Sequence, residues 1–188
     1  PSPVMGTRIE VWVTNTTGFT QNTRDVVAFQ DLAESDRIFS PNVTANPGPP
    51  IPYNSANNLY NQIGNTQGAR SLSTAIASLQ SLGYQPVNDF EKTRARKLNP
   101  TEYTLYPQLG YISLNQQLKP DEVLGVAFEF TYNGETYRVG EFSQDLPIDP
   151  NNQNVLFLKM LKATAARPRQ PIWDLMMKNI YSLGAYQV

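Results

Sequence analysis

The stretch that decides the fold is EVLGVAFEFTYNGETYRVGEF, residues 122–142. In its first half, large apolar residues alternate with small or polar ones, which is the period-two pattern of a β-strand with one apolar face. Asn133 and Gly134 follow, and this dipeptide favours a type I′ turn because both central residues of that turn have positive φ. The stretch therefore predicts a β-hairpin with a two-residue loop.

A two-residue loop also fixes the register of the hairpin. The predicted pairs are Tyr132 with Glu135, Thr131 with Thr136, Phe130 with Tyr137, Glu129 with Arg138, and Phe128 with Val139. Each pair is chemically compatible and contributes about 0.2–1 kcal/mol relative to a pair of alanines. We expect the turn at Asn133 and Gly134, and a core that contains Phe128, Phe130, Tyr137 and Val139.

The composition excludes several classes of chemistry. The chain has 188 residues with no cysteine and no histidine, so thiol catalysis, zinc-thiolate sites and iron-sulfur clusters are excluded, and the usual general base is missing. We expect no cofactor and no enzymatic activity. The net charge of −1 offers no field for nucleic acid, so we expect no nucleic-acid partner.

The length of the chain suits one domain or two small ones, and we expect a single soluble domain over residues 1–188. There is no signal peptide and no apolar run of about 18 residues, so no membrane-spanning segment is expected. Charged residues make up only 16% of the chain, a composition typical of extracytoplasmic β-rich proteins. Because the first residue is Pro1, we interpret the sequence as a piece of a longer protein.

The remaining elements indicate α+β architecture, mainly antiparallel β and sandwich-like, with two or three packed helices. Strands are expected at 8–15, 25–32, 89–97, 103–106 and 111–114, and residues 155–161 form either a strand or the start of a helix. Helices are expected from Ser55 to Gly64, from Ala69 to Leu82, and from Pro171 until Gly184 ends the last one, followed by a strand over residues 185–188. Five prolines make residues 40–53 a stiff, irregular connection.

Several side chains are candidates for an interface. Trp12 is expected on the more exposed face of its strand unless another element covers it, either partly in the core or in a binding role. Tyrosine rings suit sugar rings, so a platform of strand tyrosines is possible, although half-buried sheet residues are the simpler interpretation. Residues of the last helix form core or docking surface. The candidates are Trp12, Tyr103, Tyr106, Tyr111, Trp173, Met176 and Met177.

Charged residues give weaker hypotheses. Lys92, Arg94 and Arg96 share a strand face that could meet phosphates, but a charged edge strand is favoured. The acidic run from Asp145 to Asn154 has oxygen ligands for calcium without the spacing of a calcium loop, so a turn is favoured. An enzyme would depend on one of two acidic pairs, Asp121 with Glu122 or Asp145 with Asp149.

Long runs of the sequence resemble one family. The runs are DFEKTRARKLNPTEYTLYPQLGYISLNQQLKPDEVLGVAFEFTYNGETYRVGEFS at 89–143, LFLKMLK at 156–162 and WDLMMKNIYSLGAYQV at 173–188, together with RIEVWVTN at 8–15 and DVVAFQDLAE at 25–34. They are similar to the SprA family, also called Sov, of very large outer-membrane proteins of Bacteroidetes. Those proteins are needed for gliding motility and type IX protein secretion.

The resemblance implies a function and a location. It implies a non-catalytic structural module of an outer-membrane protein that forms part of a secretion channel or gates it. Its partners would be other parts of the same large protein, other secretion components and secreted cargo proteins. Because barrels of the outer membrane have long extracellular loops, the extracellular side is favoured over the periplasmic side. An extracellular carbohydrate-binding or adhesive module is the alternative.

Overall fold

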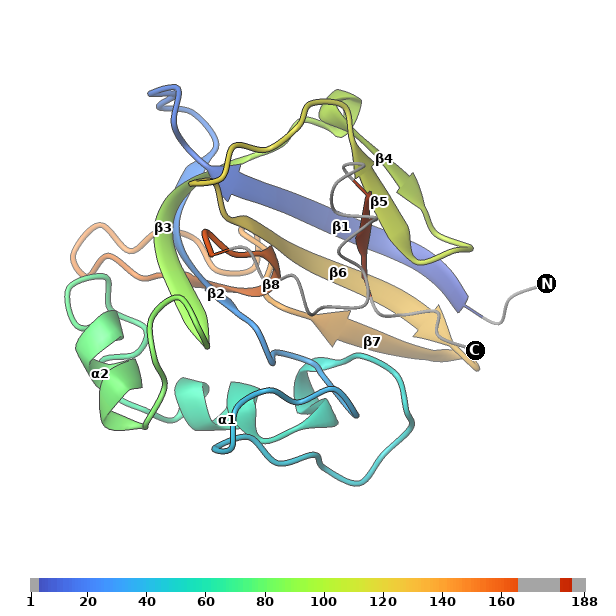
Figure 1. The fold of residues 1–188 in the computed structure, drawn as a ribbon, viewed down its shortest axis with the longest axis horizontal. Helices are drawn as coiled ribbons and strands as arrows, with labels where there is room; N and C mark the ends of the chain where they lie inside the picture. Colours follow the sequence, from blue (N-terminus) through green and yellow to red (C-terminus); the bar gives the residue numbers. More distant parts are fainter. Residues whose placement is uncertain (1–3, 166–179, 184–188) are drawn as a thin grey trace.

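The computed structural model describes residues 4–165 and 180–183, and its centre is a five-stranded β-barrel (Figure 1). Around the ring the strands are β1 (Val4–Thr14), β3 (Phe90–Lys97), β2 (Thr23–Phe29), β8 (Leu156–Lys162) and β6 (Leu124–Tyr132). Pairing of β6 with β1 closes the ring. Every pair in it is antiparallel except β2 with β8, which is parallel.

This architecture corrects the expected α+β sandwich. Strands make up 36% of the structure and helical turns 12%, and the described part has two α-helices. The mainly antiparallel pairing was predicted correctly, but the sheet closes on itself instead of facing a second sheet. The closing pair joins β1 to a strand more than 100 residues later, and local sequence patterns carry no information about such a pairing.

The apolar core consists of three clusters, one inside the barrel and two outside it. The cluster inside the barrel draws on all five ring strands and combines Trp12 with small residues such as Ala28, Ala95 and Ala127. A second cluster lies outside β1 and β6, and a third lies outside β2 and β8. The barrel wall therefore has apolar side chains on both of its surfaces, and each outer surface needs a cover.

A small three-stranded sheet covers the outer surface of β1 and β6. It consists of β4 (Tyr103–Tyr106), β5 (Tyr111–Leu114) and β9 (Ile180–Ser182), with β5 in the middle. A 3₁₀ turn, η2 (Pro100–Glu102), leads into β4. Ile112 and Leu114 pack there against Val126 and Phe128 of β6. The two short strands predicted at 103–106 and 111–114 are confirmed.

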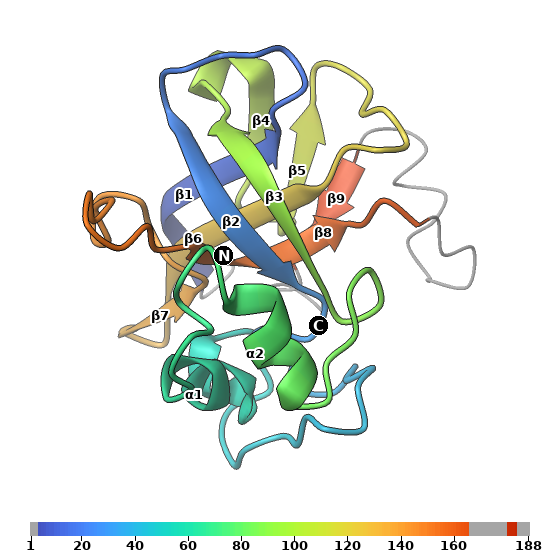
Figure 2. The same cartoon turned by 90° about the vertical axis from the view of Figure 1, so that its left-hand side faces the viewer.

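Two short helices cover the outer surface of β2 and β8, on the side of the barrel opposite the small sheet (Figures 1 and 2). They are α1 (Leu59–Gly64), which follows the 3₁₀ turn η1 (Asn54–Ala56), and α2 (Ala75–Ser81). Leu59, Ile63 and Leu79 are fully buried against Phe29 and Phe157. The helices cover the barrel wall and share its apolar cluster, without a separate core of their own.

The predicted helix limits need correction. Ser55 lies within η1 and does not cap α1; instead the Asn57 side chain accepts a hydrogen bond from the Leu59 amide at 2.9 Å. The second helix begins at Ala75, six residues later than expected, because residues 66–74 form successive turns. Ile76 is 38% exposed, so the apolar stripe runs through Ala75 and Leu79. Gly83 ends the helix at φ +92°, as predicted.

The predicted hairpin is confirmed in its register. β6 and β7 (Glu135–Val139) form the five expected pairs, from Phe128–Val139 to Tyr132–Glu135. Asn133 and Gly134 have φ of +49° and +81°. Phe128, Phe130 and Val139 are buried, while Tyr137 is half-buried and its ring stacks on that of Phe130 at 5.7 Å. The expected turn and core are therefore in place.

Replacing Gly134 by valine tests the turn. A β-branched residue tolerates positive φ poorly, and we expect a loss of about 1–2 kcal/mol in the free energy of unfolding. A Cβ at this position meets no atom within 4 Å, so the loss comes from the backbone alone. Gly134→Asn is the matched control and should keep most of the stability, since asparagine tolerates this conformation. Equal melting temperatures for the two variants would contradict the explanation.

Candidate functional site

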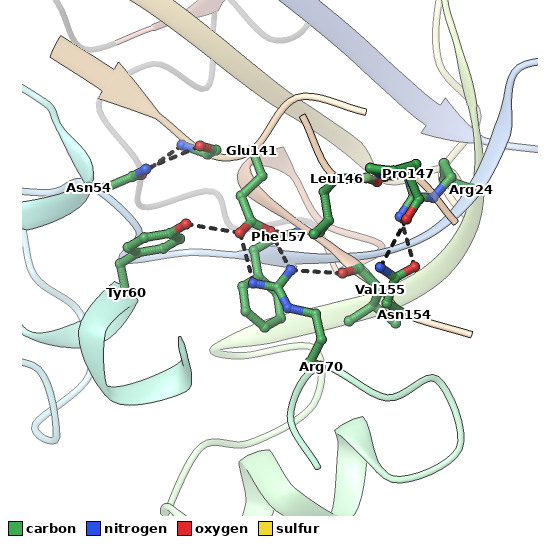
Figure 3. Close-up of polar contacts among 11 residues, drawn as sticks. Arg24, Asn54, Tyr60, Arg70, Glu141, Leu146, Pro147, Asn154, Val155 and Phe157 are labelled. Atoms are coloured by element: carbon green, nitrogen blue, oxygen red, sulfur yellow. Dashed lines mark hydrogen bonds and ion pairs between the residues drawn. The ribbon is translucent and has the colours of Figure 1, made fainter. Parts of the chain in front are cut away.

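The candidate site is centred on an ion pair between Arg70 and Glu141 (Figure 3). Arg70 donates from Nη1 to Glu141 Oε1 at 2.6 Å and from Nη2 to Oε2 at 2.8 Å. The pair is bidentate, the geometry in which a guanidinium binds a carboxylate most strongly. The side chain of Glu141 is only 12% exposed, so solvent screens the pair weakly.

Four parts of the chain meet at this pair. Arg70 lies in the turns before α2, and Glu141 follows β7. Tyr60 of α1 donates its hydroxyl proton to Glu141 Oε2 at 2.9 Å, and the Phe157 amide of β8 donates to Oε1 at 2.8 Å. The Arg70 guanidinium also donates to the Val155 carbonyl at 3.0 Å and lies 3.8 Å from the centre of the Phe157 ring. We call this set of contacts the Arg70–Glu141 clamp.

Two neighbouring contacts extend the clamp. The side-chain amide of Asn54 in η1 accepts from the Gly140 amide at 2.7 Å and donates to its carbonyl at 3.1 Å. Gly140 has φ +71°, and a Cβ there would lie 3.0 Å from the Val126 carbonyl oxygen. A glycine is thus required where the chain leaves the hairpin and passes over the barrel wall.

Arg24 of β2 fixes the loop before β8. It donates to the Leu146 carbonyl at 2.6 Å and to the Asn154 side chain at 3.3 Å, and Asn154 donates in turn to the Pro147 carbonyl at 3.2 Å (Figure 3). Arg24 is only 4% exposed, and its Nε has no hydrogen-bond partner. Burial lowers the pKa of this guanidinium. The expected turn at Asp145–Asn154 is thus held by an arginine from the barrel.

Trp12 is buried, which corrects the expectation that it lies on the more exposed face of its strand. It is 1% exposed and lies inside the barrel, because ring closure covers that side of β1. Its indole nitrogen donates to Glu10 Oε2 at 3.1 Å, and Glu10 also accepts from the amide and hydroxyl of Ser143. Trp12 is therefore a core residue whose polar atom already has a partner.

The strand tyrosines do not form a common platform. Tyr106 pairs with Tyr111 across the β4–β5 ladder, so these two share one face, and Tyr106 is 46% exposed. Tyr103 is three residues from Tyr106 and faces the other way, where it packs against the cluster outside β1 and β6. Trp173, Met176 and Met177 lie outside the described residues, as does the strand expected at 185–188. The expected last helix lies mostly outside them too, but its final part is wrong, because residues 180–182 form strand β9 and pair with β5.

The basic face of residues 89–97 does exist, but its strand is not an edge. β3 pairs with β1 on one side and with β2 on the other. Lys92 donates to the Leu72 carbonyl at 2.8 Å, Arg94 pairs with Asp25 at 2.9 Å, and Arg96 forms two bonds of 2.9 Å with Glu102. Each cation has a partner within the chain, which corrects the interpretation as a charged edge.

The acidic candidates also take part in internal contacts. Asp145 pairs with Arg8 at 3.2 Å and with Arg138 at 3.3 Å, while Asp149 accepts from the Asn151 amide at 2.9 Å. Glu122 accepts from the Lys119 amide at 2.7 Å. Within residues 4–165 and 180–183, no group of three or more acidic side chains is arranged to hold a metal ion.

Sequence reasoning missed the clamp. Arg70 and Glu141 are 71 positions apart, and neither lies in a motif that marks it as buried. The one available signal was the period-two pattern of the hairpin, which places Glu141 beyond Val139 on the apolar side.

Comparison with known proteins gives no match, either to a protein-family model or to a curated protein. The resemblance to the SprA family therefore stays a prediction from the sequence. No helix in the described part of the chain is long and apolar enough to span a membrane.

Replacing Arg70 by methionine should lower the free energy of unfolding by about 2 kcal/mol. The change leaves the Glu141 carboxylate buried without its cation, which costs roughly 3–5 kcal/mol in a fully buried pair; the 34% exposure of the Arg70 side chain reduces that figure. The matched control is Arg94→Met, because the Arg94 side chain is 51% exposed and its pair with Asp25 is worth at most about 1 kcal/mol. Denaturant unfolding of both variants measures the difference, and equal losses would refute the special role of the clamp.

Alkaline titration tests the environment of Tyr60. Burial, followed by the nearby Glu141 carboxylate, raises the pKa of Tyr60 to about 12, from 10.0 in its ordinary state. A raised pKa means that the stabilisation is complete below pH 10 and is lost as the pH rises toward 12. We expect Tyr60→Phe to remove part of this alkaline loss, as measured by denaturant unfolding at a series of pH values. A variant whose stability falls over that range as steeply as the parent chain would contradict this.

Proposed function

We propose that the chain is a non-catalytic structural module of an outer-membrane protein that serves type IX secretion and gliding motility. The resemblance to the SprA family is the basis for proposing the secretion and gliding system, and the Arg70–Glu141 clamp supports the structural role. The charged and hydrogen-bonding side chains of the clamp join the helices, the hairpin and the barrel. In a catalytic site, such side chains would have to be free to contact a substrate.

The pattern extends beyond the clamp. Arg24 holds the 145–154 loop, Lys159 pairs with Glu34 at 2.8 Å, and Asp31 accepts from the amides of Phe39 and Ser40 at 2.8 and 2.7 Å. These contacts tie long irregular segments to the barrel. A module that forms part of a channel, or gates it, must keep its shape while cargo passes, and such ties favour that role.

We further propose that the module lies on the extracellular side and contacts the rest of its own protein, other secretion components or passing cargo. The chain has no cysteine, so a single introduced cysteine can be labelled to determine on which side of the membrane the module lies. Asn152 is an exposed residue of the 145–154 loop, whereas Val27 is fully buried. A cysteine at position 152 can therefore report exposure to the medium, and a cysteine at position 27 can report the background of unspecific labelling.

In intact cells, Asn152→Cys in the full-length protein should react with a membrane-impermeant maleimide. Val27→Cys, the control, should react only after denaturation. Labelling of Asn152→Cys that requires a permeabilised outer membrane would contradict the extracellular position and place the module in the periplasm.

The structural role itself is tested by deletion. In the full-length protein, replacing residues 4–183 by a short flexible linker should abolish secretion of type IX cargo and gliding, with the amount of protein in the outer membrane as the control. Normal secretion and gliding without the module would refute the proposal. Loss of surface attachment alone would favour the adhesive alternative.

A further inference from the structure

A cleft of about 320 Å³ opens at the end of the barrel away from the clamp. It lies between the loop after β1, the turn η2 and the segment that joins β5 to β6. Its volume is at the lower end of the range of roughly 300–1,000 Å³ found for small-molecule sites. Buried Val13, Leu98 and Leu114 contribute its apolar lining, and Thr16, Thr17, Gln116 and Gln117 line it with hydroxyl and amide groups.

The walls of the cleft are held by hydrogen bonds to backbone carbonyls. The side chain of Asn115 donates to the Thr101 carbonyl at 2.6 Å, and the backbone amide of Asn115 donates to the Glu102 carbonyl at 3.0 Å. On the other side, the Lys162 ammonium donates to the carbonyls of Lys119, Pro120 and Glu122 at 2.6–3.2 Å. A site whose walls are already ordered loses little entropy when a ligand binds.

The charges in the cleft cancel. Arg96 is bound by Glu102 through two hydrogen bonds of 2.9 Å, and Lys119 lies close to Glu122, whose carboxylate accepts the Lys119 amide. The Arg96 contact lowers the pKa of Glu102 and keeps its carboxylate ionised at neutral pH. Two cations and two anions leave no net charge to attract an ionic ligand, so a neutral ligand suits the cleft best.

Unused hydrogen-bonding groups remain at the mouth. Within the described residues, the side chains of Thr16, Gln116 and Gln117 make no hydrogen bond and are exposed. Phe19 does not line the cleft itself, but it is 57% exposed and its ring lies 5.4 Å from the guanidinium of Arg96, which does line it. Amides and hydroxyls beside an apolar floor and an exposed aromatic ring match a ligand with many hydroxyls and apolar ring faces.

We propose that this cleft binds a neutral saccharide, with Gln116, Gln117 and Thr16 as hydrogen-bonding residues and Phe19 as a stacking surface. The inference does not depend on the secretion role proposed above. It also differs from a tyrosine platform, since none of the strand tyrosines lines the cleft.

The test uses the purified chain on a glycan array that carries neutral and acidic oligosaccharides. The neutral oligosaccharide with the strongest signal is then titrated by calorimetry. We expect binding of a neutral glycan, weakened about tenfold in the double variant Gln116→Ala, Gln117→Ala, since this variant loses the hydrogen bonds of both amides. Phe19→Ala should also weaken binding.

Gln144→Ala is the matched control, because Gln144 is an exposed glutamine that does not line the cleft; it should leave the affinity unchanged. Circular dichroism checks that each variant is folded. Three outcomes would overturn the proposal: binding of acidic glycans or peptides only, neutral binding that the cleft variants do not affect, and no neutral binding at affinities down to about 1 mM.

Discussion

The pairing of β1 with β6 is the constraint on which the rest of the structure depends. It runs along nearly the whole of both strands, from Val4–Tyr132 to Val13–Leu124, and it turns an open sheet into a ring. Closure removes two free edges, which would otherwise be sites for pairing with another chain. It also creates a narrow interior: a Cβ at Gly125 would lie 3.1 Å from a Leu158 methyl carbon, so a larger residue there would have to displace that side chain slightly.

Closure also accounts for the two covers. The interior of the barrel holds Leu156, Leu158 and Met160 of β8 beside Trp12, whereas Phe128 and Phe130 of β6 and Phe157 of β8 point outward and need a cover. The small sheet shields Phe128 and Phe130, and the helices shield Phe157. The Arg70–Glu141 clamp then fixes the helical cover, because short helices of six and seven residues have little stability of their own.

Local features of this fold were predictable from the sequence, whereas the way they combine was not. The hairpin at Asn133–Gly134 was predicted with its register, since turn chemistry and alternation act over a few residues. Trp12 was misjudged because alternation shows which residues share a face, but not whether that face is covered. The basic residues of β3 looked like an edge for the same reason. The clamp depends on two charged residues 71 positions apart, and a single sequence does not show such a pairing.

The parallel contact of β2 with β8 has a consequence for folding. It joins Val26 to Leu156 and Phe29 to Lys159, so the ring stays incomplete until the last barrel strand is available. Domains dominated by such distant contacts fold slowly, on the order of milliseconds to seconds, because loop-closure entropy is lost before the contacts form. During synthesis the first strands emerge with unpaired edges and with apolar side chains on both faces, a state prone to aggregation. For this chain, the period between emergence of β1 and arrival of β8 is when a chaperone would matter most.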